Sequence, residues 1–221
     1  MRAAHFCSAC GKVQPPMPVD YFTFFGLPRK LEINPAQLEK EFYALNRKLH
    51  PDVYAAAPDQ EREWSLEQSS LLNDAYRTLK DPIRRTEYLL RLEGVELEEQ
   101  SKAATEKARA TGELKKQVVP PDMLEEVFEL NMQLEELRMQ KKMGEDDPAL
   151  LEELGKAKLS LEDKSEALMN ELHGLWREWD QSVDSGTEEQ RRTLRDKMVD
   201  LVNRRNYLRN LVRDVNEALE T

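Results

Sequence analysis

Apolar residues recur at helical spacing through most of the chain, and the breaks in this pattern fall at proline and glycine. A dense apolar cluster at residues 21–25 predicts a short helix. A longer helix follows, which Asn34 and Pro35 open as N-cap and first residue. Its predicted buried stripe consists of Leu38, Phe42, Leu45 and Leu49. The first part of the chain therefore predicts four helices, at residues 21–25, 35–49, 60–80 and 82–93.

The rest of the chain carries three longer helical patterns, at residues 121–143, 148–180 and 187–219. Asp147 supplies a cap for the second of them, and Thr187 with Gln190 has the spacing of a capping box for the third. Short links between long helices imply antiparallel neighbours. An all-α fold that includes an antiparallel three-helix bundle follows. The expected core stripe of its second helix consists of Leu154, Leu161, Leu168, Leu172, Leu175 and Trp179.

The first bundle helix has two apolar stripes. One seam consists of Met123, Val127, Leu130, Leu134 and Leu137. The other lies roughly 140° around the helix and consists of Leu124, Phe128 and Met132. On the last helix, Tyr207 falls roughly 130° from the core seam by the same geometry. A surface helix needs only one apolar face, so these residues indicate either a thick bundle that buries both faces or a docking surface.

The tripeptide His50-Pro51-Asp52 stands where the second helix must stop. Pro51 has no amide hydrogen and disfavours helical geometry at the residue before it. A polar corner is therefore expected between two amphipathic helices. A histidine at a helix end has an ordinary explanation, because a cation favours the negative end of the helix dipole.

Two functional explanations for the corner compete with that structural one. The charged residues Lys40, Arg47 and Lys48 lie off the apolar stripe of the preceding helix, which favours contact with a partner protein. Catalysis would need His50 as a general base and Asp52 to orient it. No nucleophile or substrate pocket accompanies them, so we do not expect an enzyme.

Charge and composition narrow the function classes. The 221 residues carry a formal net charge of −10, which disfavours a nucleic-acid binder. No apolar run approaches the ~20 residues that span a membrane. The first 18 residues lack the apolar core of a secretory signal, so a cytoplasmic protein is expected. No glycine-rich loop that would hold the phosphates of a nucleotide is present.

The two cysteines, Cys7 and Cys10, form a Cys-x-x-Cys motif followed by glycine and lysine. This arrangement is typical of one knuckle of a zinc ribbon, whereas a closed structural zinc site needs four ligands. His5 is a candidate third ligand. Three alternatives remain: half of a zinc site completed by a second molecule, a knuckle without metal, or a reducible thiol pair. We expect no other cofactor.

The first part of the chain contains several motifs in order: Asp20-Tyr21-Phe22, Leu27-Pro28, Leu49-His50-Pro51-Asp52, and the run from Leu72-Asn73-Asp74-Ala75-Tyr76 to Asp81-Pro82 with Arg85. Together they resemble a J-domain. In that family, the His-Pro-Asp corner and the basic face before it engage a DnaK-type chaperone and trigger its ATP hydrolysis. The resemblance thus implies that His50, Pro51 and Asp52 are the trigger and that Lys40, Arg47 and Lys48 are docking charges.

Two segments carry a narrower resemblance: residues 20–28 and Arg85-Thr86-Glu87-Tyr88-Leu89-Leu90. They resemble HscB, the J-type co-chaperone of iron–sulfur cluster assembly. In eukaryotic relatives a two-knuckle zinc module precedes the J-domain, and Phe6-Cys7-Ser8-Ala9-Cys10 resembles its second knuckle. The HscB bundle binds the scaffold IscU through its first helix and an aromatic residue of its last. The resemblance implies that the scaffold-binding residues are Leu124, Phe128, Glu129, Met132, Glu136 and Tyr207, with Glu125 and Met132 departing from the usual pattern.

The expected protein is therefore a co-chaperone that delivers an IscU-like scaffold to an HscA-like, DnaK-type ATPase. The alternative is a general J-domain co-chaperone for another client. Two further classes are a small hydrolase and a zinc-linked coiled-coil protein. Biochemical tests would distinguish either from a co-chaperone. The expected parts are an N-terminal tail at 1–18, a J-domain at 19–93, a linker at 94–119 and the scaffold-binding bundle at 120–221.

Overall fold

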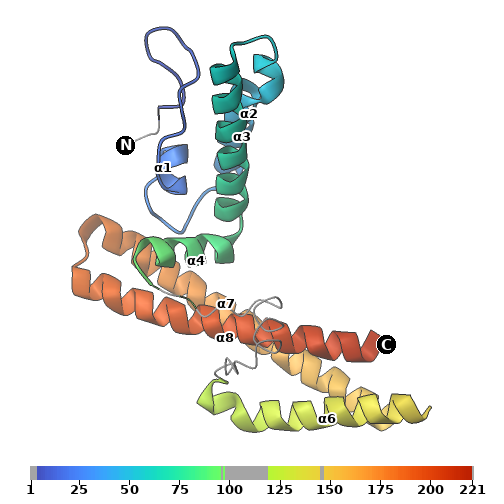
Figure 1. Cartoon of the computed structure of the whole chain (residues 1–221). Helices are drawn as coiled ribbons and strands as arrows, with labels where there is room; N and C mark the ends of the chain where they lie inside the picture. The colour runs from blue at the N-terminus through green and yellow to red at the C-terminus, as the bar shows by residue number, and fades with distance from the viewer. Residues whose placement is uncertain (1–3, 96, 98–118, 145–146, 221) are drawn as a thin grey trace. The chain divides into compact units, whose positions relative to one another are not determined.

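A computed structural model describes residues 4–95, 97, 119–144 and 147–220. Helices are the regular elements of the described part, together with an isolated antiparallel bridge between Phe6 and Val13, and the predicted all-α fold is confirmed. Along the chain (Figure 1) the elements are α1 (Tyr21–Phe25), α2 (Pro35–Leu49), η1 (Pro51–Tyr54), α3 (Asp59–Lys80), α4 (Pro82–Leu92), η2 (Pro121–Met123), α6 (Leu124–Met143), α7 (Pro148–Ser185) and α8 (Glu188–Glu220).

The chain divides into two compact units. The first combines Met1–Glu96 with Leu175–Arg195, and the second contains Leu97–Gly174 and Asp196–Thr221. The last turns of α7 and the first turns of α8 thus belong to the first unit. The expected linker at 94–119 lies largely outside the described residues, and the domain boundaries drawn from the sequence stay predictions. Within the described ranges, no helix is long and apolar enough to cross a membrane.

In the first unit, α2 and α3 lie side by side and α1 packs against α3 (Figure 1). The helix boundaries follow from local chemistry. Asp20 caps α1 by accepting a 3.0 Å hydrogen bond from the Thr23 N–H, and Asn34 caps α2 through the N–H of Gln37 at 3.2 Å. The core that these helices enclose includes Phe22, Phe24, Leu31, Leu38, Leu49, Leu72, Leu79, Leu89 and Leu90.

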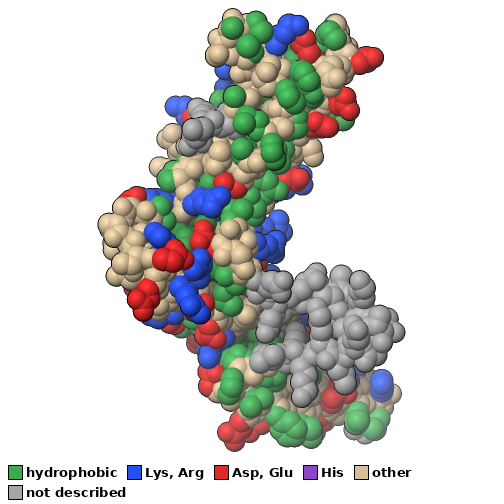
Figure 2. All heavy atoms as spheres, turned by 60° about the vertical axis from the view of Figure 1, so that its left-hand side comes forward, with side chains coloured by type: hydrophobic (Ala, Val, Ile, Leu, Met, Phe, Trp, Pro, Cys, Tyr) green, Lys and Arg blue, Asp and Glu red, His purple; other side chains and the backbone are tan. Residues whose placement is uncertain are grey.

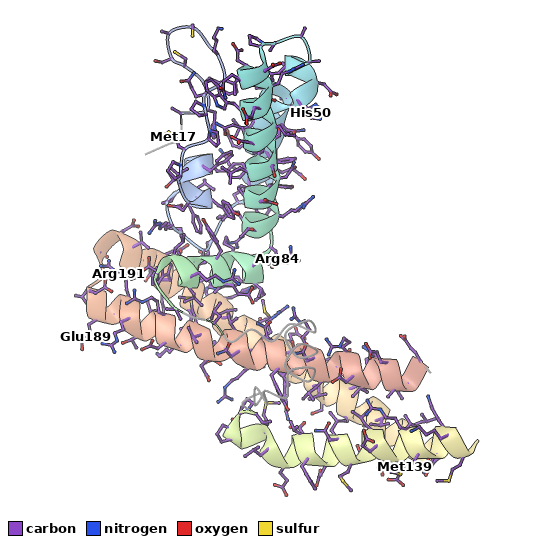
Figure 3. All side chains as sticks on the ribbon, viewed as in Figure 1. Met17, His50, Arg84, Met139, Glu189 and Arg191 are labelled. Carbon is purple, nitrogen blue, oxygen red and sulfur yellow. The ribbon has the colours of Figure 1, made fainter. Side chains whose placement is uncertain are left out.

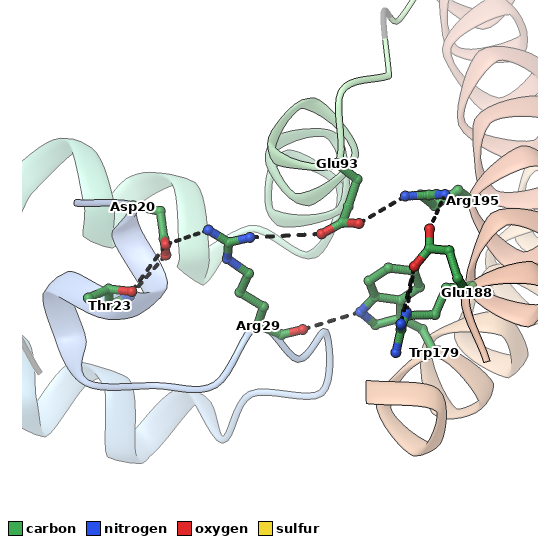
Figure 4. A network of polar contacts seen from close by, with 8 residues as sticks. Asp20, Thr23, Arg29, Glu93, Trp179, Glu188 and Arg195 are labelled. Atoms are coloured by element: carbon green, nitrogen blue, oxygen red, sulfur yellow. Dashed lines mark hydrogen bonds and ion pairs between the residues drawn. The ribbon is translucent and has the colours of Figure 1, made fainter. Parts of the chain in front are cut away.

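Polar contacts join the 175–195 segment to the rest of the first unit (Figure 4). The Trp179 indole N–H donates to the Arg29 carbonyl at 3.2 Å. The Arg29 side chain lies 2.9 Å from Asp20 and 3.9 Å from Glu93, which in turn pairs with Arg195 at 3.0 Å. The sequence pattern correctly predicts that Trp179 is buried, but its indole N–H donates to a residue between α1 and α2, not to a bundle helix.

In the second unit, the core lies between α6, the first part of α7 and the second part of α8. It contains Val127, Leu130, Leu134, Leu137, Leu154, Leu161, Leu208 and Val215. The core residues of α6 and α7 among them belong to the stripes predicted for these two helices. Gly144 ends α6 in the left-handed region, with φ of 74°. Asp147 caps α7 as predicted, accepting from the N–H of Ala149 at 2.9 Å.

The α7–α8 junction lies in the first unit and carries the predicted capping box. The Gln190 N–H donates to the Thr187 hydroxyl at 3.2 Å, and the Thr187 N–H donates to the Gln190 side chain at 2.9 Å. α7 runs to Ser185, five residues beyond the predicted end, because no residue before Gly186 breaks the helix.

Candidate functional site

The His-Pro-Asp corner is presented to solvent at the end of α2 (Figure 3). His50 leaves helical geometry, with φ of −60° and ψ of 133°, and serves as N-cap of η1. Its Nδ1 accepts a hydrogen bond of 3.3 Å from the backbone N–H of Asp52 and lies 3.4 Å from the Asp52 carboxylate. The two side chains are 48% and 90% exposed, so a partner protein can reach both. Neither group has the dry surroundings that favour general-base catalysis.

Two serines of α3 fix the position of the corner. The carbonyl of Leu49, the last residue of α2, accepts hydrogen bonds from the hydroxyls of Ser65 at 2.7 Å and Ser69 at 2.8 Å. All three residues are buried, so this carbonyl would otherwise be an unsatisfied acceptor at a helix end. The sequence analysis did not identify either serine. The sequence signal that could have identified them is a pair of small polar residues, four positions apart, on the buried side of α3.

The three predicted docking charges line α2 before the corner. Lys40 and Arg47 are exposed and make no ion pair with another described residue. The Lys48 ammonium lies 5.9 Å from the centre of the Phe6 ring, within cation–π range. The acid Glu39 is engaged elsewhere, since it accepts from the Tyr76 hydroxyl at 3.1 Å and lies 3.8 Å from Lys80. Lys40, Arg47 and Lys48 thus place three positive charges along α2, a helix that also carries the acids Glu39 and Glu41.

The second apolar stripe of α6 is exposed. The exposed fractions of Leu124, Phe128 and Met132 are 54%, 67% and 59%. Met139 and Met143, which the sequence analysis passed over, continue the stripe at helical spacing and are also exposed. Met139 points away from the neighbouring helices of its unit (Figure 3). The two alternatives were a bundle that buries both apolar faces of α6 and an exposed docking surface. In the structure one apolar face of α6 is buried and the other is exposed.

Acidic residues border this apolar stripe. Glu125, Glu129 and Glu136 are exposed, and hydrophobic and acidic surface alternates over α6 at the foot of Figure 2. Glu129 also lines a shallow pocket of about 240 Å³ between α6 and α7, whose floor includes Leu130 and Leu161. The surface of α6 therefore fits a partner that is apolar at its centre and basic at its edge.

Tyr207, which the resemblance makes a scaffold-binding residue, is buried, so the docking alternative is wrong for this residue. The side chain is 4% exposed and packs in the core of the second unit with Leu208 and Leu211. Burial raises the pKa of its phenol above the ordinary value. The sequence analysis assumed one narrow core seam on α8, whereas the helix is buried over a wide arc that includes Val202 and Asn206. Tyr207 is therefore left out of the surface proposed below.

His5, the candidate third zinc ligand, is engaged within the fold. His5 is buried, its Nε2 donates to the Phe24 carbonyl at 3.0 Å and its Nδ1 lies 3.2 Å from Gln68 Oε1. Cys7 and Cys10 share a tight turn, but in the described part of the chain no group of three or more His, Cys, Asp or Glu residues could hold a metal ion. A four-ligand zinc site does not fit these residues of a single chain.

The chain resembles known proteins over a short segment in sequence and over a longer one in fold. No protein-family model matches the chain. Two proteins described as Co-chaperone protein HscB homolog, from Vibrio cholerae serotype O1 strains, are 46% and 44% identical to it over 79 residues. That match covers 36% of this chain and 46% of each relative, so the chain spans about half the length of the curated relatives it matches. The resemblance to HscB-type co-chaperones is confirmed.

Two solved HscB structures have the same fold over most of the chain. The crystal structure of human HscB superposes with a TM-score of 0.66 at 22% identity, covering 98% of this chain and 91% of that one. HscB from Vibrio cholerae gives a TM-score of 0.59 at 24% identity, covering 91% and 98%. The similarity of fold to HscB thus extends beyond the segment in which the sequences match.

Proposed function

We propose that this chain is a J-type co-chaperone of iron–sulfur cluster assembly. Through α6 it binds an IscU-like scaffold protein, and through the His-Pro-Asp corner it stimulates a DnaK-type, HscA-like chaperone ATPase. The observation that carries the proposal is the exposed apolar stripe of α6, because a helix of a three-helix bundle has no structural need for it. The HscB name of the sequence relatives supports the same function.

The chaperone-binding half of the proposal rests on α2 and the corner. The positive charges of Lys40, Arg47 and Lys48 attract an acidic surface on a partner. They contrast with the net charge of the whole chain, which is −10. His50 and Asp52 are exposed beyond it, held in place by the α3 serines behind Leu49. Pro51 restricts the backbone there, so little conformational entropy is lost when the corner docks.

The scaffold-binding half rests on the α6 surface, formed by Leu124, Phe128 and Met132 with Glu129 and Glu136 beside them. An exposed aromatic side chain surrounded by apolar neighbours has the composition of a binding hot spot. Two binding surfaces on one chain raise the effective concentration of scaffold at the ATPase. In this role the protein is an adaptor without catalysis of its own, and we assign it to the cytoplasm.

Steady-state ATP hydrolysis by a DnaK-type chaperone tests the proposal. Addition of the full chain should stimulate turnover, and scaffold should increase the stimulation. Asp52→Asn should abolish stimulation and leave scaffold binding unchanged. Asp163→Asn, an exposed position in the second unit, is the matched control and should stimulate normally. Normal stimulation by Asp52→Asn would show that the trigger is misassigned.

The alternative is a general J-domain co-chaperone for another client. Direct binding between purified chain and an IscU-like scaffold separates the two. Stimulation of the ATPase without any scaffold binding would favour the alternative and would retain only the chaperone-binding half of the proposal.

A further inference from the structure

The segment from Phe6 to Val13 is a closed turn that carries both cysteines of the chain. The Cys7 N–H donates to the Lys12 carbonyl at 2.8 Å, and the Gly11 N–H donates to the Cys7 carbonyl at 2.9 Å. Gly11 adopts a φ of 73°, which other residues reach only with strain. The chain therefore folds back on itself at the cysteines and holds them on the same small loop.

This turn is fixed to the first unit at several points. Val13 is fully buried, and buried His5 bonds to the Phe24 carbonyl. The Lys12 ammonium donates to the Glu61 carboxylate of α3 at 2.8 Å. With both ends attached, the loop keeps the two thiols near each other rather than letting them separate as they would in a free tail.

Hydrogen bonds converge on the sulfur of Cys7. The backbone N–H groups of Cys10 and Ala9 and the side chain of Cys10 donate to it. Cys10 is exposed and Cys7 is half-buried, so small solutes reach both. Adjacent, accessible thiols of this kind exchange readily with disulfides.

The surrounding residues favour thiol chemistry over metal binding. His5 uses both ring nitrogens within the fold, and Glu61 pairs with Lys12. No further His, Cys, Asp or Glu of the described ranges joins the cysteines in a potential metal site. Two thiolates fill only half of a tetrahedral zinc site.

We propose that Cys7 and Cys10 form a reversible dithiol–disulfide pair that reacts with low-molecular-weight disulfides. The Cys7 thiolate attacks one sulfur of the external disulfide, forms a mixed disulfide and releases one thiol. The Cys10 thiolate then attacks the Cys7 sulfur, closes the internal disulfide and releases the second thiol. Two electrons and two protons pass from the cysteines to the external disulfide. This inference goes beyond the proposed co-chaperone function and does not depend on it.

Intact-mass spectrometry after alkylation tests the pair in the full chain. The reduced protein is equilibrated with glutathione buffers of increasing disulfide content, and free thiols are then blocked with N-ethylmaleimide. Since the chain contains two cysteines, an internal disulfide can form only between Cys7 and Cys10. We expect a single transition in which both alkylation sites are lost together, and dithiothreitol should restore them.

Cys10→Ser is the diagnostic variant, because it should stop at the mixed disulfide on Cys7. Ser8→Ala, within the same turn, should behave like the wild type. Three outcomes would overturn the proposal: two free thiols in every buffer, mixed or intermolecular disulfides without internal closure, or retained zinc that protects both thiols from glutathione disulfide. Circular dichroism of each variant verifies that the helices are intact.

Discussion

The carboxylate of Asp180 accepts a hydrogen bond of 2.6 Å from the backbone N–H of Leu31, and both residues are buried. Its other oxygen accepts from the N–H of Glu32 at 2.9 Å. Burial raises the pKa of Asp180 above its ordinary value, and the two N–H groups oppose that rise. The Asp180 side chain of α7 thus accepts hydrogen bonds from two backbone N–H groups in the segment between α1 and α2.

Replacing this acceptor should destabilise the protein. Asp180→Ala leaves the buried Leu31 N–H without its partner, which costs about 1–3 kcal/mol. Asp184→Ala is the matched control: Asp184 pairs with Lys30 at 2.6 Å but is 66% exposed, and its loss should cost less than about 1 kcal/mol. Urea unfolding followed by circular dichroism measures both. Equal losses from the two variants would contradict the role of Asp180.

The two serines behind Leu49 should act redundantly. Ser65→Ala or Ser69→Ala alone leaves one hydroxyl on the Leu49 carbonyl and should cost less than about 1.5 kcal/mol. The double variant leaves that carbonyl unsatisfied, so its cost should exceed the sum of the single losses. A double-mutant cycle of unfolding free energies measures the coupling. Strict additivity would mean that each serine contributes independently.

The Asp20 carboxyl should stabilise the fold only when it is ionised. Burial acts to raise its pKa, but hydrogen bonds from Thr23 and Arg29 outweigh burial and lower the pKa below the unfolded value of 3.8. The stabilisation is therefore present above pH 3.8 and is lost as the pH falls through the still lower folded pKa.

Asp20→Asn isolates this charge, because asparagine also caps helices well. Its stability deficit relative to the wild type should be constant near neutral pH and should shrink below pH 3.8. Unfolding free energies across the acidic range give the difference. A deficit that does not change with pH would assign the effect to capping geometry instead of charge.

Scaffold binding should depend on the apolar stripe of α6. Phe128→Ala removes an exposed aromatic side chain and should weaken binding about tenfold or more. Leu159→Ala is the matched control, since Leu159 is a similarly exposed apolar residue on α7 of the same unit. Isothermal titration calorimetry with a purified IscU-like scaffold measures both, and neither variant should change the unfolding free energy appreciably. Equal weakening by the two would place the binding surface elsewhere.

Features set by a few neighbouring residues could be predicted from the sequence. The caps at Asn34 and Asp147 and the capping box at Thr187 and Gln190 are where the local signals place them. The position of the second apolar stripe of α6 follows from the same 3.6-residue geometry, which would also have found Met139 and Met143, whereas its exposure is known only from the structure.

Features set by distant partners could not be predicted in this way. The burial of Tyr207 depends on how much of α8 its neighbours cover, which periodicity does not record. His5 has the chemistry of a metal ligand, but contacts with Phe24 and Gln68 bury it. The Trp179 stripe indicates burial, whereas its partner at Arg29 lies 150 residues away in sequence.

Three of the five exposed apolar residues of α6 are methionines: Met132, Met139 and Met143. A methionine side chain is unbranched and flexible, and its polarisable sulfur packs against many surface shapes at low energetic cost. Such a surface discriminates weakly by shape and would tolerate small changes in the contour of a protein bound to it. The same helix could therefore retain one partner through successive conformations, with Phe128 as the fixed anchor and the thioethers conforming around it.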